Sequence, residues 1–138
     1  MSIHLIPYLM MPGNGQEVVR FYEQALDAKV LALQTYGEMP QNPDSPLPAQ
    51  LNDYVGHAHL KIGESELMLS DSTDESNQAG NRVTICIATD DVEKAKKLFH
   101  ALQQGGQVNH PFEKTFFSPG FGTVTDKFGV TFQIVTEG

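Results

Sequence analysis

The sequence predicts an α+β fold made of two tandem β-α-β-β-β modules, and three observations support this prediction. The chain has 138 residues, of which 40% are hydrophobic and 19% charged, as expected for one globular domain. The order strand, amphipathic helix and three strands occurs twice along the chain. A polar segment with too few apolar residues to pack separates the two copies. We therefore expect a single domain at 1–138, with module one at 1–72, a linker at 73–80 and module two at 81–138.

The first module begins with a mostly apolar run at residues 3–11, which predicts a largely buried strand that ends at a Pro-Gly-Asn-Gly turn. Apolar residues then recur at helical spacing over 18–26, and Asn14 with Glu17 resembles a helix-capping pair. The branched and aromatic residues of 29–36 are typical of a strand. These features predict strand, helix and strand in that order.

A proline-rich segment and a hairpin complete the first module. Residues 37–54 carry four prolines within nine residues, which forbids a regular element there. Loops of this length in a small domain usually cover or line a cavity, so we expect a lid or a cavity rim. Residues 57–62 and 66–70 then predict two strands of a hairpin, joined by a turn at 63–65.

The second module repeats the same order. Residues 83–88 predict a strand, and Asp90-Asp91 can cap a helix whose apolar residues keep helical spacing over 92–102. Gly105-Gly106 ends this helix. Three strands follow at 107–117, 122–125 and 130–135, with a type I turn at 126–129 between the last two.

Charge and cysteine content restrict the partners and the compartment. Nine Lys and Arg against seventeen Asp and Glu give a formal charge of −8, which provides no attraction to nucleic acid or to an anionic membrane surface. Cys86 has no second cysteine to pair with, so a reducing compartment fits and we expect a buried, inert thiol. No signal peptide or membrane-spanning run is visible. We expect a soluble cytoplasmic protein without nucleic-acid or membrane partners.

Two motif-like features are interpreted as structural. The turn at 12–15 joins a strand to a helix, as in a dinucleotide-binding motif, but Val18 stands in the place of the third glycine. We interpret it as a capping turn, which also argues against an S-adenosylmethionine-binding methyltransferase fold. Asp71, Asp74 and Glu75 lack the spacing of a calcium loop and are interpreted as a solvated acidic run.

Several segments, in order over nearly the entire chain, carry a family resemblance. They are 6–9 (IPYL), 21–28 (FYEQALDA), 57–63 (HAHLKIG), 67–71 (LMLSD) and 121–134 (FGTVTDKFGVTFQI). Together they resemble the PhnB-like branch of the vicinal oxygen chelate superfamily, which includes glyoxalase I, extradiol dioxygenases and the bleomycin and fosfomycin resistance proteins. The resemblance implies curved, antiparallel-rich sheets around a central cavity and assembly as a homodimer. The methyltransferase and phosphonate names used in this branch establish no reaction.

The resemblance also identifies the positions where metal-dependent relatives hold a divalent ion with four side chains. In this sequence those positions fall on Pro7, Met68, Thr84 and Gln133. None is His, Asp or Glu, the side chains that suit such an ion. We therefore expect no metal and no cofactor, and instead a cavity lined by Met68, Thr84, Gln133 and Cys86 that suits a small organic molecule.

Histidine and phenylalanine residues supply the other candidates. His57 and His59 lie two apart on a strand and share one face, so they could contact a ligand, coordinate a metal together with His4, or serve only as polar residues at the cavity edge. A dense phenylalanine segment suits the core, a cavity mouth or a dimer contact. The candidate ligand-binding residues are Tyr8, His57, His59, Met68, Thr84, Phe117, Phe121 and Gln133.

Three functions remain open from the sequence. The favoured one is metal-free binding of a small organic molecule, as in the resistance proteins. The alternative is an enzyme: a metal-dependent lyase or dioxygenase, or a metal-free isomerase, using His57 or His59. A dimeric interaction module without a small ligand is expected if Met68, Phe117 and Phe132 fill the central space.

Overall fold

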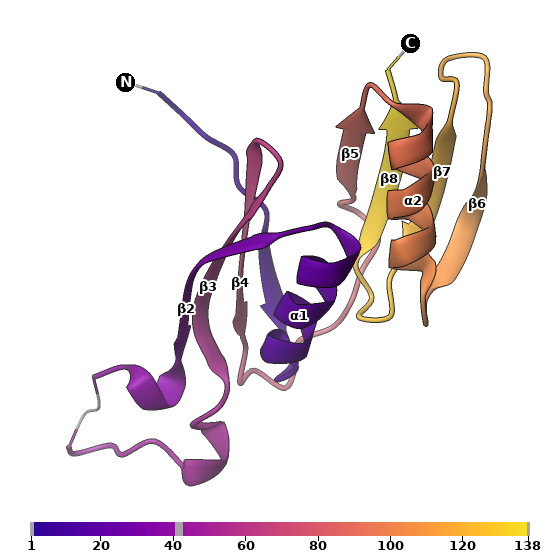
Figure 1. Ribbon diagram of the computed structural model, residues 1–138. Helices are drawn as coiled ribbons and strands as arrows, with labels where there is room; N and C mark the ends of the chain where they lie inside the picture. The colour runs from indigo at the N-terminus through magenta and orange to yellow at the C-terminus, as the bar shows by residue number, and fades with distance from the viewer. Residues whose placement is uncertain (1, 41–42, 138) are drawn as a thin grey trace. The chain divides into compact units, whose positions relative to one another are not determined.

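The computed structural model describes residues 2–40 and 43–137. These residues form two compact units, the first ending at Gln78 and the second beginning at Ala79. Each unit has one long helix and one open four-stranded sheet (Figure 1). The predicted α+β fold of two tandem β-α-β-β-β modules is therefore confirmed. No helix among the described residues is long and apolar enough to cross a membrane.

The first unit has the strand order β1-β4-β3-β2, in which β1 pairs parallel to β4 and the other pairs are antiparallel. Helix α1 covers one face of this sheet, because Val18, Val19 and Tyr22 are buried on the side that packs against β2, β3 and β4. The elements are β1 (Tyr8–Met11), α1 (Gly15–Ala25), β2 (Lys29–Thr35), β3 (Val55–Ile62) and β4 (Ser65–Asp71), with 3-10 turns at Tyr36–Glu38 and Ala49–Leu51.

The first strand is shorter than predicted. The sequence predicts a strand over 3–11, but β1 begins only at Tyr8, and Ile3 and Leu5 are 87% and 94% exposed. Pro7 has no N–H to donate and contributes only its carbonyl, which accepts from Met68 N at 2.9 Å. The apolar side chains before Pro7 therefore have no strand partner within the unit to bury them.

Asp71 is a buried polar residue of the first unit. Two sequence predictions, the solvated acidic run and the Asn14 cap, are wrong here. The Asp71 carboxylate is 1% exposed and accepts hydrogen bonds from Gly13 N at 3.1 Å, Gly15 N at 2.8 Å and Val55 N at 2.8 Å. It is thus a buried anchor rather than part of a solvated acidic run. Asn14 makes no capping hydrogen bond through its side chain, and the first amide of α1, Gly15 N, donates to Asp71 instead.

The second unit repeats this topology with the order β5-β8-β7-β6, and β5 is parallel to β8. Asp91 caps the helix as predicted, since its carboxylate accepts from Glu93 N at 2.9 Å. The predicted turn after β7 is also confirmed, with Gly129 N bonded to Asp126 O at 3.0 Å. The elements are β5 (Ile85–Thr89), α2 (Val92–Gln103), β6 (Gln107–Glu113), β7 (Phe121–Thr125) and β8 (Thr131–Thr136).

The core of the second unit lies between α2 and its sheet. Phe99 and Leu102 of α2 are buried together with Val124, Phe132 and Ile134 of the sheet. Phe132, which is 1% exposed, therefore belongs to the helix side of the sheet. This placement contradicts the expectation that Phe132 could fill a space on the opposite face.

Candidate functional site

In each unit the sheet face opposite the helix carries the predicted site residues. In the first unit Leu67 and Leu69 are buried under α1, so the alternation of β4 turns Met68 to the open face. Met68 is the cross-strand partner of Tyr8 on β1 and of His59 on β3. Tyr8, Met68 and His59 therefore form one row across three strands, with His57 two residues away on the same face.

The two histidines of this row have different partners. The ring of His57 contacts the Tyr8 hydroxyl, with 3.4 Å between Nδ1 and Oη. Nε2 of His59 donates to the carboxylate of Glu66, at 2.5 Å from Oε1. The side chains of His59 and Glu66 are 23% and 38% exposed, so the pair is partly shielded from water. A histidine held in this way by a carboxylate keeps Nδ1 available to exchange a proton with a bound molecule.

Glu66 is a functional candidate that the sequence reasoning missed. It precedes Met68 by two residues, so strand alternation already places the two side chains on one face. Lys61 is its direct partner across the hairpin, and this register brings Glu66 diagonally next to His59. Applying the alternation to the whole hairpin, rather than to the histidines alone, could have found this residue.

The open face of the second unit brings together the polar candidates. Gln133 donates from Nε2 to the Thr84 hydroxyl at 3.2 Å, and its cross-strand neighbours are Cys86 and Thr123. The prediction of a buried Cys86 is wrong, because the residue is exposed on the face away from α2. The pKa of its thiol is nevertheless raised, first by partial desolvation and second by the negative charge of Glu137. A neutral thiol at pH 7 agrees with the expectation of low reactivity.

A row of aromatic rings extends this face. Phe117 contacts Phe121 with 5.1 Å between ring centroids, and Phe121 contacts His110 at 5.6 Å. Phe116 continues the row beyond Phe117 at 5.3 Å and is fully exposed. The structure therefore groups Phe117 and Phe121 as predicted candidates and adds His110, whose position depends on an irregular β6–β7 register that the sequence pattern does not show.

The four superfamily metal positions do not fit a divalent ion. Pro7 has no donor side chain, Met68 offers a weak thioether, and Gln133 is bonded to Thr84. Among the described residues, no group of three or more His, Cys, Asp or Glu side chains could hold a metal ion. The chemistry available at these positions is hydrogen bonding and apolar contact.

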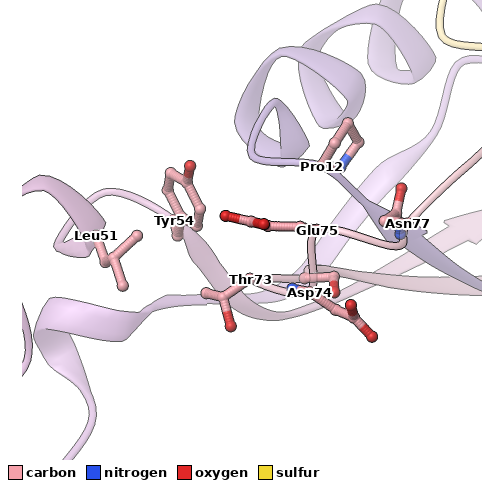
Figure 2. A pocket seen from close by; sticks show the side chains of 8 residues that line it. Pro12, Leu51, Tyr54, Thr73, Asp74, Glu75 and Asn77 are labelled. Carbon is pink, nitrogen blue, oxygen red and sulfur yellow. Dashed lines mark hydrogen bonds between the residues drawn. The ribbon is translucent and has the colours of Figure 1, made fainter.

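A pocket of about 290 Å³ lies elsewhere in the first unit (Figure 2). It contains none of the predicted site residues. Leu51 and Tyr54 of the predicted lid or rim segment 37–54 contribute to its wall, and residues 41 and 42 of the same segment lie outside the described residues. The lining residues are Pro12, Leu51, Tyr54, Ser72, Thr73, Asp74, Glu75 and Asn77.

Comparison with known proteins gives the family. The family model described as 3-demethylubiquinone-9 3-methyltransferase matches residues 3–135. Protein YjdN of Escherichia coli (strain K12) is 32% identical over 136 residues, which cover 94% of this chain and 92% of YjdN. Both comparisons extend over nearly the whole sequence.

Solved structures show the same fold. The crystal structure of protein PA1353 from Pseudomonas aeruginosa has a TM-score of 0.84 at 34% identity and covers 99% of this chain and 98% of its own. A PhnB protein from Bacillus cereus has a TM-score of 0.79 at 24% identity, with 97% and 99% covered. The fosfomycin resistance protein FosX from Listeria monocytogenes has a TM-score of 0.69 at 9% identity, covers 100% and 95%, and supports the fold alone. The chain therefore belongs to the 3-demethylubiquinone-9 3-methyltransferase family, a PhnB-like branch with the vicinal oxygen chelate fold.

Proposed function

We propose that this protein binds a small organic molecule on its open sheet faces through hydrogen bonds and apolar contacts, without a metal ion. The observation that carries the proposal is the residue set at the superfamily metal positions: Pro7, Met68, Thr84 and Gln133. An amide, a hydroxyl and a thioether beside exposed aromatic rings provide weak ligands for an ion but suitable contacts for an organic molecule. Tyr8 and Phe117, which are 44% and 54% exposed, leave their rings accessible to such a ligand.

We propose no methyl-transfer activity for this protein. An S-adenosylmethionine or dinucleotide site of the doubly wound type uses a largely parallel sheet and free glycine-turn amides. Here each sheet has one parallel pair. The amides of Gly13 and Gly15 already donate to Asp71. The turn after β1 therefore serves the fold and has no amide at these two glycines to offer a phosphate.

A ligand screen by thermal shift tests the proposal. We expect at least one organic compound to raise the melting temperature in a saturable way and EDTA to leave it unchanged. Gln133→Ala should weaken the effect of that compound by roughly fivefold, since it removes one hydrogen-bonding group from the face. Gln107→Ala, an exposed glutamine of β6, is the matched control and should leave the effect unchanged. A large loss of melting temperature in EDTA would contradict metal-free binding.

A second candidate function is a metal-free isomerase, and the hydrogen bond between His59 and Glu66 favours it. In this candidate, Nδ1 of His59 removes a proton from a carbon of the bound molecule and returns it at another position, while Glu66 stabilises the imidazolium. Incubating a bound compound in D₂O and following its carbon-bound protons by NMR tests this function. Exchange that disappears in His59→Asn while binding persists would support it, and absence of exchange would leave binding as the function.

A further inference from the structure

The pocket of Figure 2 has a chemical character that differs from that of the two sheet faces. Its lining combines an aromatic ring and aliphatic side chains, from Tyr54, Leu51 and Pro12, with the carboxylates of Asp74 and Glu75. No Lys, Arg or His side chain is among the lining residues. The pocket thus offers negative charge next to apolar surface.

The carboxylates of Asp74 and Glu75 differ in their hydrogen-bond partners. Asp74 is held by Ser76, whose backbone N–H and hydroxyl donate to Oδ1 at 2.8 and 2.7 Å. These two hydrogen bonds lower the pKa of Asp74 below its ordinary value, so the group is an anion at neutral pH. Glu75 has no hydrogen bond or ion pair with the described part of the chain, and its side chain extends toward Tyr54 (Figure 2). Glu75 is therefore the carboxylate whose two oxygens are both available to a ligand.

The walls of the pocket are held by bonds to the rest of the unit. Asn77 donates from its side chain to Met10 O at 2.9 Å, and Tyr54 O accepts from Tyr36 N at 2.8 Å. The Tyr54 hydroxyl lies so close to Gly13 that a Cβ at this glycine, which has φ 122°, would be 2.7 Å from it. A wall fixed in this way reduces the ordering cost when a ligand binds.

We propose that this pocket binds an organic ammonium cation carried on a small apolar body. The Glu75 carboxylate and the face of the Tyr54 ring attract the positive group, and Leu51 and Pro12 contact the alkyl part. The formal charge of −8 adds a long-range attraction for cations. A bare metal ion fits less well, since Oδ1 of Asp74 already accepts from Ser76 and the Leu51 and Pro12 side chains supply no ligand atoms. None of these pocket residues belongs to the candidate sites on the sheet faces, so binding here is independent of the function proposed above.

Titration of the full chain with choline at low ionic strength tests the proposal, with binding followed by calorimetry or NMR. We expect saturable binding, and binding that is roughly fivefold or more weaker for the uncharged isostere 3,3-dimethylbutan-1-ol. Glu75→Gln should weaken choline binding by roughly fivefold, because it removes the charge and keeps the shape. Tyr54→Leu should weaken it by roughly threefold through loss of the ring face, in a variant first shown to fold by circular dichroism.

Glu64→Gln is the matched control, because Glu64 is an exposed acid in the β3–β4 turn and its replacement changes the net charge equally. It should leave choline affinity unchanged. If Glu64→Gln and Glu75→Gln weakened choline binding equally, only the general attraction of the net charge would be acting. That result would overturn the proposal. So would equal binding of choline and the isostere, or no saturable binding of choline.

Discussion

At the scale of single residues, the Asp71 side chain fixes the β1–α1 turn, although Asp71 lies far from this turn in the sequence. Its carboxylate joins the β1–α1 turn to the start of β3 through Gly13, Gly15 and Val55. Its own carbonyl accepts from the Tyr36 hydroxyl at 2.7 Å. Charge-assisted bonds to several buried amides are among the stronger polar interactions in proteins.

We predict that Asp71→Asn destabilises the protein by about 1–3 kcal/mol, because the amide group of asparagine would face N–H donors and leave at least one unsatisfied. Urea denaturation of the variant and the wild type measures this difference. Asp53→Asn, at an exposed aspartate, controls for the change of charge and should lie within about 0.5 kcal/mol of the wild type. Equal stability of Asp71→Asn and the wild type would show that the carboxylate is not an anchor.

Cys86 gives a second prediction at this scale. Partial desolvation and then the charge of Glu137 raise the pKa of the thiol above 9.0, so the thiolate fraction stays small at neutral pH although the residue is exposed. Alkylation by iodoacetamide should therefore keep accelerating as the pH rises beyond 9.0. Glu137→Gln should shift the midpoint of this profile to lower pH. A profile with its midpoint below that of the urea-unfolded protein would contradict the raised pKa.

At the scale of elements, periodic patterns in the sequence predict the helices and strands. They do not predict contacts between residues that lie far apart in the chain. Helical spacing placed α1 and α2, and strand alternation placed His57, His59 and Met68 on one face. The wrong prediction at Asn14 has a physical cause of this kind: the Asp71 carboxylate, which accepts from the first amide of α1, lies far along the chain. Likewise Tyr54 and Glu75 border one pocket only because two loops adopt particular conformations. No local pattern contains that information.

The contact between the start of α1 and the end of β4 gives a prediction at this scale. A Cβ at Gly15 would lie 2.8 Å from Asp71 Oδ2, so Gly15→Ala should force the two elements apart and cost about 1–3 kcal/mol. Gly80→Ala meets nothing within 4 Å and should change stability by less than about 0.5 kcal/mol. Thermal or urea unfolding of both variants compares them. Similar stabilities would mean that the helix start does not need this close approach.

At the scale of the whole molecule, the exposed apolar side chains suggest association of two copies. Ile3, Leu5 and Phe116 are 87%, 94% and 101% exposed in the single chain, and burying such side chains in an interface between copies would be favourable. We propose a homodimer, and sedimentation velocity should find twice the mass of the 15.2 kDa chain. Leu5→Glu should shift the equilibrium toward monomer. A wild-type protein that stays monomeric at high concentration would contradict this proposal.

Metal-free ligand binding is tested by the metal content of protein purified without a tag, measured by mass spectrometry, together with ligand binding before and after EDTA. Because Pro7, Met68, Thr84 and Gln133 offer no imidazole or carboxylate, we predict far less than one divalent ion per chain and ligand binding that EDTA leaves unchanged. One tightly held ion per chain, with binding lost on its removal, would contradict metal-free binding.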